Sequence, residues 1–451
     1  MLTLQEKREL FLNPYLKYKD EIDARIEEGI EKYRKGYSRI RLTDEEGNPI
    51  AGKKVKITQK THDFKYGANI FLLDEFDNDE HNKEYRRMFK EYFNLATVPF
   101  YWDTLEPEEG SPRYDKNSKK IYRRPAPDLC MDYCEENGVT PKLHCLVYEH
   151  FAPAWLRDLP LDEAKKKYEE RFRQISERYA GRMMEFEVTN ELFYEAGWKE
   201  KSKVSGTKDL VPWAYNLARK YFPNETLVLN EGNPLPDISW DKYRSKYYMM
   251  VENAILKGVP IDKLGLQHHL FGSICGAKNE EEMDQALIHF DKALCDPRRI
   301  FTGLDIVSEF GLPLEITEVT VPTFGESEEA EEIQAELLKI LYSTWFSHPA
   351  VNTVVYWNTA DGYTYVAEGS NWNENRCKGG LFHHDLTPKK SALMLKKLFD
   401  EIWHTDLELT TDKDGYIDFR GFFGEYLAET DDAGFEFGLH KAEDNCYEIV
   451  I

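Results

Sequence analysis

The chain has 451 residues, of which 41% are hydrophobic and 31% are charged, so it can bury one large core and keep a soluble surface. Its formal net charge is −23 and no basic cluster offsets it, which argues against nucleic acid or an anionic membrane as a partner. The seven cysteines are odd in number and scattered, which is more typical of reduced thiols than of a disulfide framework.

The N-terminus carries no recognisable targeting segment. The first residues lack the basic and apolar regions of a signal peptide, and no apolar run reaches the roughly 18 residues of a membrane-spanning helix. We therefore expect a cytoplasmic protein from the chain as given. A secreted protein whose signal peptide had been removed would have the same sequence features.

The N-terminal segment, residues 1–36, is predicted to be helical. Residues 3–35 are rich in Glu, Lys, Arg and Leu at helical spacing, and Gly36 is a natural helix stop. A β pattern begins directly after it.

Both ends of the chain contain strand patterns. Residues 38–43 and 53–58 alternate between apolar and polar side chains on either side of the turn cluster 44–49, which predicts a β-hairpin. The C-terminal segment shows the same alternation. Because an isolated hairpin is marginally stable in water, we expect residues 37–62 and 406–451 to meet in one small β-sandwich domain. The alternative is two unrelated β appendages.

The segment between them, residues 63–405, alternates short apolar strands with helical stretches. The eight candidate strands lie at 64–71, 95–101, 142–148, 186–189, 227–230, 264–267, 312–318 and 351–357. Helical patterns lie at 162–179, 241–257, 279–294 and 328–346. This alternation predicts an α/β fold, a (β/α)8 TIM barrel, with the β-sandwich-like domain built from both chain ends.

Two of the predicted strands end in glutamate. Catalytic groups of such barrels project from the carboxyl ends of strands, and here these ends carry Glu191 and Glu318. Cleavage of a glycosidic bond needs one carboxylic acid to protonate the leaving oxygen and one carboxylate to meet the anomeric carbon. The pair therefore predicts a glycoside hydrolase.

The strands around these glutamates resemble glycoside hydrolase family 10, the xylanase family. Phe186-Glu-Val-Thr-Asn-Glu191 resembles its acid/base motif, usually Trp-Asp-Val-Val-Asn-Glu, and Ile316-Thr-Glu-Val-Thr-Val resembles its nucleophile strand. Further matches occur in the family's order at 143–148, 153–155, 229–233, 265–270, 357–361, 380–382 and 388–389. The resemblance implies a retaining endo-1,4-β-xylanase without a cofactor, acting on a β-linked polysaccharide or oligosaccharide, with Glu191 as acid/base and Glu318 as nucleophile.

The resemblance also implies roles for residues near the two glutamates. Asn190 would bind the sugar 2-hydroxyl, and His144 would contact the sugar beside the cleavage point, with Trp357 as its stacking platform. Gln267 would orient Glu191. His269 would hold Glu318 and keep it ionised through a charge-assisted hydrogen bond.

Several substrate-reading positions depart from the family pattern. Residues 97–102, ending in Trp102, replace a Glu-Asn-Glu-Met-Lys-Trp motif, and Tyr148-Glu149 replace the usual Trp-His. Thr320 replaces the aspartate behind the nucleophile's histidine. We therefore expect a retained mechanism with altered specificity, and we include Trp102, Tyr148, Glu149 and Asn233 among the substrate-binding candidates.

Three alternatives remain at this stage. The same mechanism could act on another β-linked glycan. The lost binding residues suggest a non-catalytic carbohydrate-binding barrel, although both glutamates are intact. The paired histidines at 268–269 and 383–384 suggest a metal-dependent hydrolase, but the first strand lacks the His-x-His such an enzyme would use, so no metal is expected.

Overall fold

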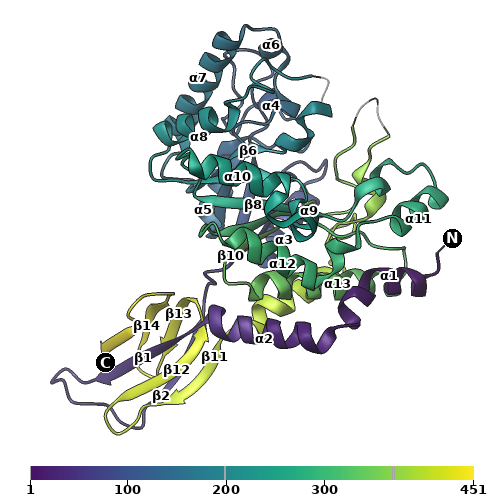
Figure 1. Ribbon diagram of the computed structural model, residues 1–451. Helices are drawn as coiled ribbons and strands as arrows, with labels where there is room; N and C mark the ends of the chain where they lie inside the picture. Colours follow the sequence, from purple (N-terminus) through teal and green to yellow (C-terminus); the bar gives the residue numbers. More distant parts are fainter. Residues whose placement is uncertain (1, 198–199, 368, 370) are drawn as a thin grey trace.

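The computed structural model describes residues 2–197, 200–367, 369 and 371–451, which form a barrel and a smaller β-sandwich (Figure 1). Eight parallel strands close the barrel in the order β10-β3-β4-β5-β6-β7-β8-β9. The predicted (β/α)8 fold is therefore confirmed. The barrel strands are β3 (Lys65–Asn69), β4 (Leu95–Pro99), β5 (Thr140–His144), β6 (Glu185–Asn190), β7 (Thr226–Glu231), β8 (Lys263–His269), β9 (Leu314–Thr320) and β10 (Val351–Tyr356).

Helices connect the barrel strands and cover the outside of the barrel (Figure 1). Their apolar faces recur at helical spacing: α7, for example, buries Tyr168, Phe172, Ile175 and Tyr179 and exposes charged residues between them. The helices are α3 (Asp79–Tyr92), α4 (Trp102–Leu105), α5 (Pro127–Asn137), α6 (Ala154–Arg157), α7 (Leu161–Tyr179), α8 (Leu210–Tyr221), α9 (Pro234–Asp241), α10 (Lys246–Leu256), α11 (Glu280–Ile288), α12 (Pro297–Ser308), α13 (Glu328–Ser347) and α14 (Lys390–Lys397).

Two N-terminal helices, α1 (Leu4–Leu16) and α2 (Lys19–Arg34), lie against α13 on the outside of the barrel. A capping box between Thr3 and Glu6 begins α1. The helical pattern was predicted to stop at Gly36, but α2 ends at Arg34 and Gly36 lies inside the first strand of the sandwich. There the ring of Phe423 would meet a Cβ at 2.6 Å, so close packing requires glycine.

The sandwich has two sheets, ordered β12-β1-β15 and β11-β2-β13-β14. Its strands are β1 (Lys35–Thr43), β2 (Lys54–Gln59), β11 (Asp406–Thr410), β12 (Tyr416–Phe422), β13 (Gly424–Glu429), β14 (Gly434–Leu439) and β15 (Cys446–Val450). Alternate residues of both sheets, among them Ile40, Ile57, Phe419 and Tyr426, meet in a core of their own.

The predicted hairpin of residues 38–43 and 53–58 is wrong. β1 pairs with β12 and β15, whereas β2 pairs with β11 and β13 in the other sheet. Each strand has one buried face, so placing them in opposite sheets lets Ile40 and Ile57 face each other across the core. The ladder partners of both strands come from the C-terminal end of the chain.

Charged side chains occupy the interior of the barrel. Lys142 on β5 is fully buried, and its Nζ lies 2.6 Å from Glu187 on β6 and in direct contact with Glu315 on β9. Lys263 on β8 lies 3.3 Å from Glu315 and 2.7 Å from Glu185. Burial lowers the pKa of Lys142, but these carboxylates outweigh it and raise that pKa above its usual value. The cluster therefore links four strands through ionised groups.

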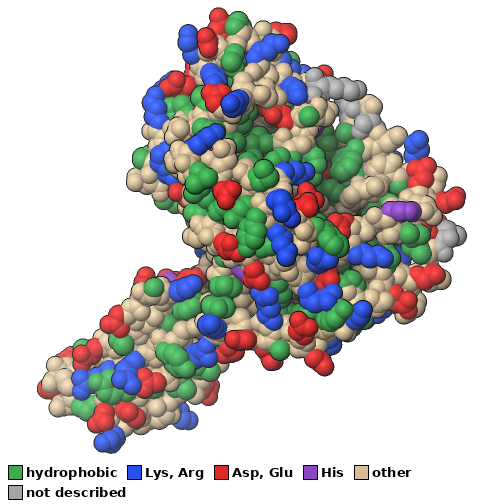
Figure 2. Space-filling view, in the orientation of Figure 1, with side chains coloured by type: hydrophobic (Ala, Val, Ile, Leu, Met, Phe, Trp, Pro, Cys, Tyr) green, Lys and Arg blue, Asp and Glu red, His purple; other side chains and the backbone are tan. Residues whose placement is uncertain are grey.

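Acidic and basic side chains are interspersed over the molecular face shown in Figure 2, where the sandwich protrudes from the barrel. Within the described part of the chain, none of the helices combines the length and apolar character that crossing a membrane would require.

We predict that Lys142→Met destabilises the protein by about 3–5 kcal/mol, because it removes the fully buried cation that Glu187 and Glu315 share. Guanidinium denaturation followed by tryptophan fluorescence would measure the loss. Lys165→Met is the matched control: its ion pair with Asp209 is partly exposed, and we expect a change of about 1 kcal/mol or less. Equal effects of the two substitutions would contradict a structural role for the buried cluster.

Candidate active site

Glu191 lies directly after β6, at the carboxyl end of the barrel. Its backbone adopts a left-handed conformation (φ 53°), which is strained for a non-glycine residue, and its N–H donates to the carbonyl of Asn230 at 3.2 Å. The Tyr148 hydroxyl donates to Glu191 Oε2 at 2.5 Å. Burial, reinforced by the charge of Glu191, raises the pKa of Tyr148 well above its usual value, so the phenol remains a donor. Backbone and phenol together fix the carboxylate.

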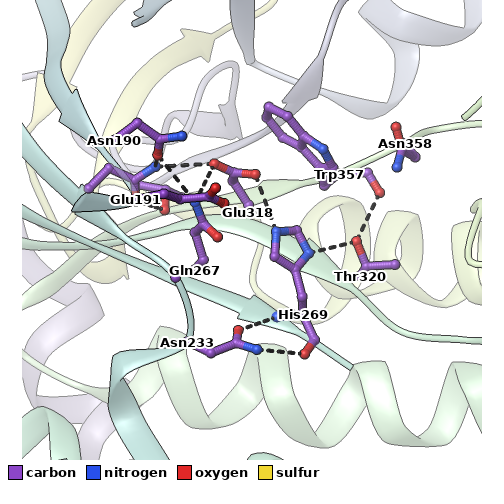
Figure 3. Close-up of polar contacts among 12 residues, drawn as sticks. Asn190, Glu191, Asn233, Gln267, His269, Glu318, Thr320, Trp357 and Asn358 are labelled. Atoms are coloured by element: carbon purple, nitrogen blue, oxygen red, sulfur yellow. Dashed lines mark hydrogen bonds and ion pairs between the residues drawn. The ribbon is translucent and has the colours of Figure 1, made fainter. Parts of the chain in front are cut away.

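Glu318 on β9 is buried and surrounded by nitrogen atoms (Figure 3). Its Oε1 accepts from Asn230 Nδ2 at 3.1 Å and from Gln267 Nε2 at 2.9 Å, and its Oε2 lies 3.2 Å from His269 Nε2. The ladder between β8 and β9 shifts register just before Glu318. Because a register shift re-aims the following side chains, Thr317 and Glu318 can both contact Asn230.

Asn230, at the end of β7, contacts residues of both β6 and β9. Its Nδ2 donates to Glu187, Asn190 and Glu318 at 2.8–3.1 Å, and its Oδ1 accepts from the Thr317 hydroxyl. Sequence reasoning included residue 230 in a matching segment but did not identify it as a site residue. A buried amide at the end of an otherwise apolar strand was the available signal.

His144 on β5 is held by a carboxylate and a phenol. Its Nδ1 lies 2.5 Å from Glu187 Oε2 and its Nε2 lies 3.1 Å from the Tyr101 hydroxyl. Burial lowers the pKa of His144, but Glu187 outweighs it and raises that pKa above its usual value. The ring of Trp357 packs edge-on against His144, with centroids 5.2 Å apart. His144 and Trp357, two predicted site residues, are therefore in contact.

The electrostatics of Glu318 differ from the prediction. Burial raises the pKa of Glu318 well above its usual value; the charge of His144 opposes this, and the carboxylates of Glu191 and Glu187 add to it. Burial also lowers the pKa of His269 to about 4. His269 is therefore neutral near pH 7 and adds no positive charge beside Glu318, whereas the 3.2 Å contact through which it was predicted to hold Glu318 is present. The cation that favours ionised Glu318 is His144.

Thr320 and Asn233 support the far side of His269 (Figure 3). His269 Nδ1 lies 3.0 Å from the Thr320 hydroxyl, which also lies 3.4 Å from the carbonyl of Trp357. The Thr320 hydroxyl donates its hydrogen to the carbonyl of Trp357, so it is left to accept from His269 Nδ1, the role that the family's aspartate would also have. Asn233 binds both the N–H and the carbonyl of His269, at 2.7 and 2.9 Å. Asn233 is thus placed to position His269.

Three further predictions need correction. Gln267 contacts Glu318 and Asn190, and among the described contacts it has none with Glu191, which it was expected to orient. Glu149 is buried, and its oxygens accept from Tyr168 and Ser202; its described hydrogen bonds include none with Glu191 or Glu318. Trp102 is buried against Trp155 and Tyr168, and its Nε1 donates to Glu106 at 2.8 Å. Glu149 and Trp102 therefore hold loops together, because their polar atoms already have partners.

One group of potential metal ligands lies within this site: atoms of His144, Glu187 and Glu318 come within 4.8 Å of one another. Each already has a hydrogen-bond partner, because His144 binds Glu187 and Glu318 binds two amides. His268 contacts the carbonyl of Leu294 at 2.9 Å and packs edge-on against Trp345. The donor set fits a hydrogen-bonded carboxylate pair better than a metal centre.

Replacing Glu318 by Gln should stabilise the protein. Folding raises the pKa of this carboxyl group. The free energy of unfolding therefore falls as pH rises above the pKa of the unfolded chain, and the fall is complete above the pKa of the folded protein. At pH 8 we expect Glu318→Gln to raise the Tm by about 1–3 °C, with a smaller gain at pH 4, where both states hold the proton. Scanning calorimetry at both pH values tests this, and a lower Tm at pH 8 would contradict it.

Comparison with known proteins identifies the family. The sequence model of glycosyl hydrolase family 10 matches residues 65–396. The anti-sigma-I factor RsgI6 of Acetivibrio thermocellus is 25% identical, over 88% of this chain and 45% of its own length. Endo-1,4-beta-xylanase 2 of Arabidopsis thaliana is 22% identical, over 84% of this chain and 31% of its own. The chain thus spans less than half the length of either protein.

Solved structures share the barrel. Xylanase 10B from Thermotoga petrophila in complex with xylobiose superposes with a TM-score of 0.57 at 19% identity, over 75% of this chain and 95% of that one. The intracellular xylanase TsXylA from Thermoanaerobacterium saccharolyticum gives 0.55 at 18% identity, over 74% and 95%. The family match covers most of the chain and includes both glutamates, and the chain belongs to glycosyl hydrolase family 10.

Proposed function

We propose that this protein is a retaining glycoside hydrolase of the xylanase type, which cleaves β-1,4-linked xylan or xylo-oligosaccharides. One observation carries the proposal: Glu318 is fixed by Asn230, Gln267 and His269 at the end of one strand, while Glu191 is fixed by Tyr148 at the end of another. This arrangement supplies two carboxyl groups with different surroundings, as double displacement requires.

In the first step, a carboxylate oxygen of Glu318 bonds to the anomeric carbon while the bond from that carbon to the leaving oxygen breaks. Glu191 donates its proton to the leaving oxygen. In the second step, Glu191 accepts a proton from water, and the water oxygen displaces Glu318 from the anomeric carbon. Two inversions at one carbon retain its configuration.

The neighbouring groups fit roles in this reaction. The Asn190 side-chain oxygen accepts from Asn230 and Gln267. The NH2 group of Asn190 is therefore left to donate to a sugar hydroxyl. Trp357 lies in an aromatic cluster with Phe71 and Tyr101, with Tyr148 and Phe151 packed beside it. Aromatic faces bind the C–H faces of sugar rings, so this cluster can form the platform beside the cleavage point.

Support for xylan as the substrate comes from the relatives, several of which are named endo-1,4-beta-xylanases. The segment around Tyr101 and Trp102 departs from the family pattern. A second candidate substrate is therefore another β-linked glycan, cleaved by the same mechanism. A non-catalytic carbohydrate-binding barrel is the remaining candidate, and the ordered donors around Glu318 speak against it.

The proposal predicts hydrolysis of xylo-oligosaccharides with initial release of the β-anomer, and a loss of activity of at least about 10⁴-fold in Glu318→Ala. Chromatography of products from xylo-oligosaccharides, cello-oligosaccharides and aryl β-xylosides would give the specificity, and NMR would give the anomer. Glu177→Ala, on the outside of α7, is the control and should retain wild-type activity. Initial release of the α-anomer would rule out retention, and no cleavage of any substrate would favour the binding barrel.

The acid limb of the pH profile should depend on His144. Because the charge of His144 lowers the pKa of Glu318, removing it in His144→Asn raises that pKa further. The fall in kcat/KM toward low pH should then begin at a higher pH than in the wild type, as ionised Glu318 becomes scarcer. Rates on an aryl β-xyloside between pH 4 and 9 would show this; an acid limb at an unchanged pH would contradict it.

A further inference from the structure

The loop between α4 and α5 brings Arg124 to the aromatic cluster beside the catalytic glutamates. The guanidinium carbon lies 4.0 Å from the centre of the Tyr101 ring, 5.5 Å from that of Phe71 and 5.6 Å from that of Phe151. The Arg124 side chain is half-buried. Its charge is therefore held against ring faces, where water screens it less than on the open surface.

Arg124 uses little of its hydrogen-bonding capacity. Its single side-chain hydrogen bond among the described residues runs from Nη1 to the carbonyl of Arg123 at 2.9 Å, and its buried Nε has no partner. The buried Arg171 nearby differs, because it donates to the carbonyls of Phe100, Cys145 and Leu146. A guanidinium has four N–H donors on its two Nη atoms, and one of them is used on Arg123, so the other three have no protein partner among the described residues and can donate to a ligand.

A single side chain, that of Tyr101, connects Arg124 to the residues that contact the catalytic glutamates. Its stacking partner Tyr101 bonds through its hydroxyl to His144, at 3.1 Å, and the Tyr101 ring centre lies 6.1 Å from that of Tyr148, which holds Glu191. A sugar unit placed next to the cleavage point would therefore pass close to Arg124.

A second arginine adds positive charge behind the first. Arg123 is buried, donates to the carbonyl of Tyr363 and to Asn358 Oδ1, and has no partner at Nε. These bonds tie the loop to the segment after β10. The catalytic carboxylates and the net charge of −23 would repel an acidic sugar. The guanidinium groups of Arg123 and Arg124 offset that repulsion locally, and the acidic groups that interact with them are Glu374 and Asp103, respectively.

We propose that Arg124 is a subsite for the carboxylate of a uronic acid carried by the β-linked glycan substrate. A carboxylate matches the planar guanidinium edge through two parallel hydrogen bonds, and the Tyr101 ring leaves that edge available by stacking on its face. The inference rests on the proposed hydrolase function and specifies its substrate as an acidic glycan, with the neutral backbone held by the aromatic cluster.

The test compares a xylo-oligosaccharide carrying one glucuronic acid group with the neutral oligosaccharide of the same length. In the wild type, kcat/KM for the acidic substrate should exceed that for the neutral one, and the ratio should fall at least about tenfold in Arg124→Met, which keeps the apolar stem against the rings. Arg124→Lys should keep part of the preference, because its charge remains but its fork is lost. Raising the salt concentration should weaken the preference.

Arg173→Met, which removes an exposed arginine paired with Glu177, is the matched control and should leave the ratio unchanged. Calorimetry would measure the affinity of both oligosaccharides for Glu318→Gln, with and without Arg124→Met. It reports on binding at the subsite in the absence of turnover. Equal use of both substrates by the wild type, or an equal ratio in Arg124→Met, overturns the inference while leaving the hydrolase intact. Tighter binding of the acidic oligosaccharide without cleavage of either substrate supports the subsite and rejects the hydrolase; binding of neither rejects both.

Discussion

The interior of this barrel is organised by ionised groups whose charges depend on one another. Lys142 stands between Glu187 and Glu315, and Glu187 in turn holds His144. His144 is the cation that favours ionisation of Glu318. The charge on the proposed nucleophile therefore depends on a series of contacts that begins at Lys142, which lies two residues before His144 on β5. Stability and reactivity are therefore coupled through the same side chains, which is common where an active site is built from buried charge.

The order of elements was predictable because the patterns are local. Each of the eight predicted strands overlaps a barrel strand, and the long helices at 162–179 and 328–346 lie where helical periodicity placed them. The poorest match is the predicted strand 142–148, which runs past the end of β5 at His144. The sandwich pairing was not predictable, because alternation shows that a strand has a buried face but not which strand lies beside it. β1 and β2 are close in sequence, yet they belong to different sheets.

The candidate site was predictable to the extent that strand ends reveal it. Glu191 and Glu318 follow from that rule together with the family resemblance. Strict alternation would place Thr317 and Glu318 on opposite faces, so the register shift that lets both reach Asn230 is visible only in three dimensions. Lys142 and His144, two residues apart on one strand, could have been recognised as a shared inward face, but their acidic partners lie on other strands.

The pairing of the two chain ends has a consequence for biosynthesis. Arg39 of β1 lies opposite Cys446 of β15, and Ser38 binds the carbonyl of Asn445, a contact that spans 407 positions. β1 and β2 leave the ribosome long before their partner strands are synthesised. These two strands with apolar faces therefore stay unpaired while the barrel between them is synthesised and folds. The sandwich can therefore be completed only after β15 has been synthesised, and until then the nascent chain carries exposed strand edges.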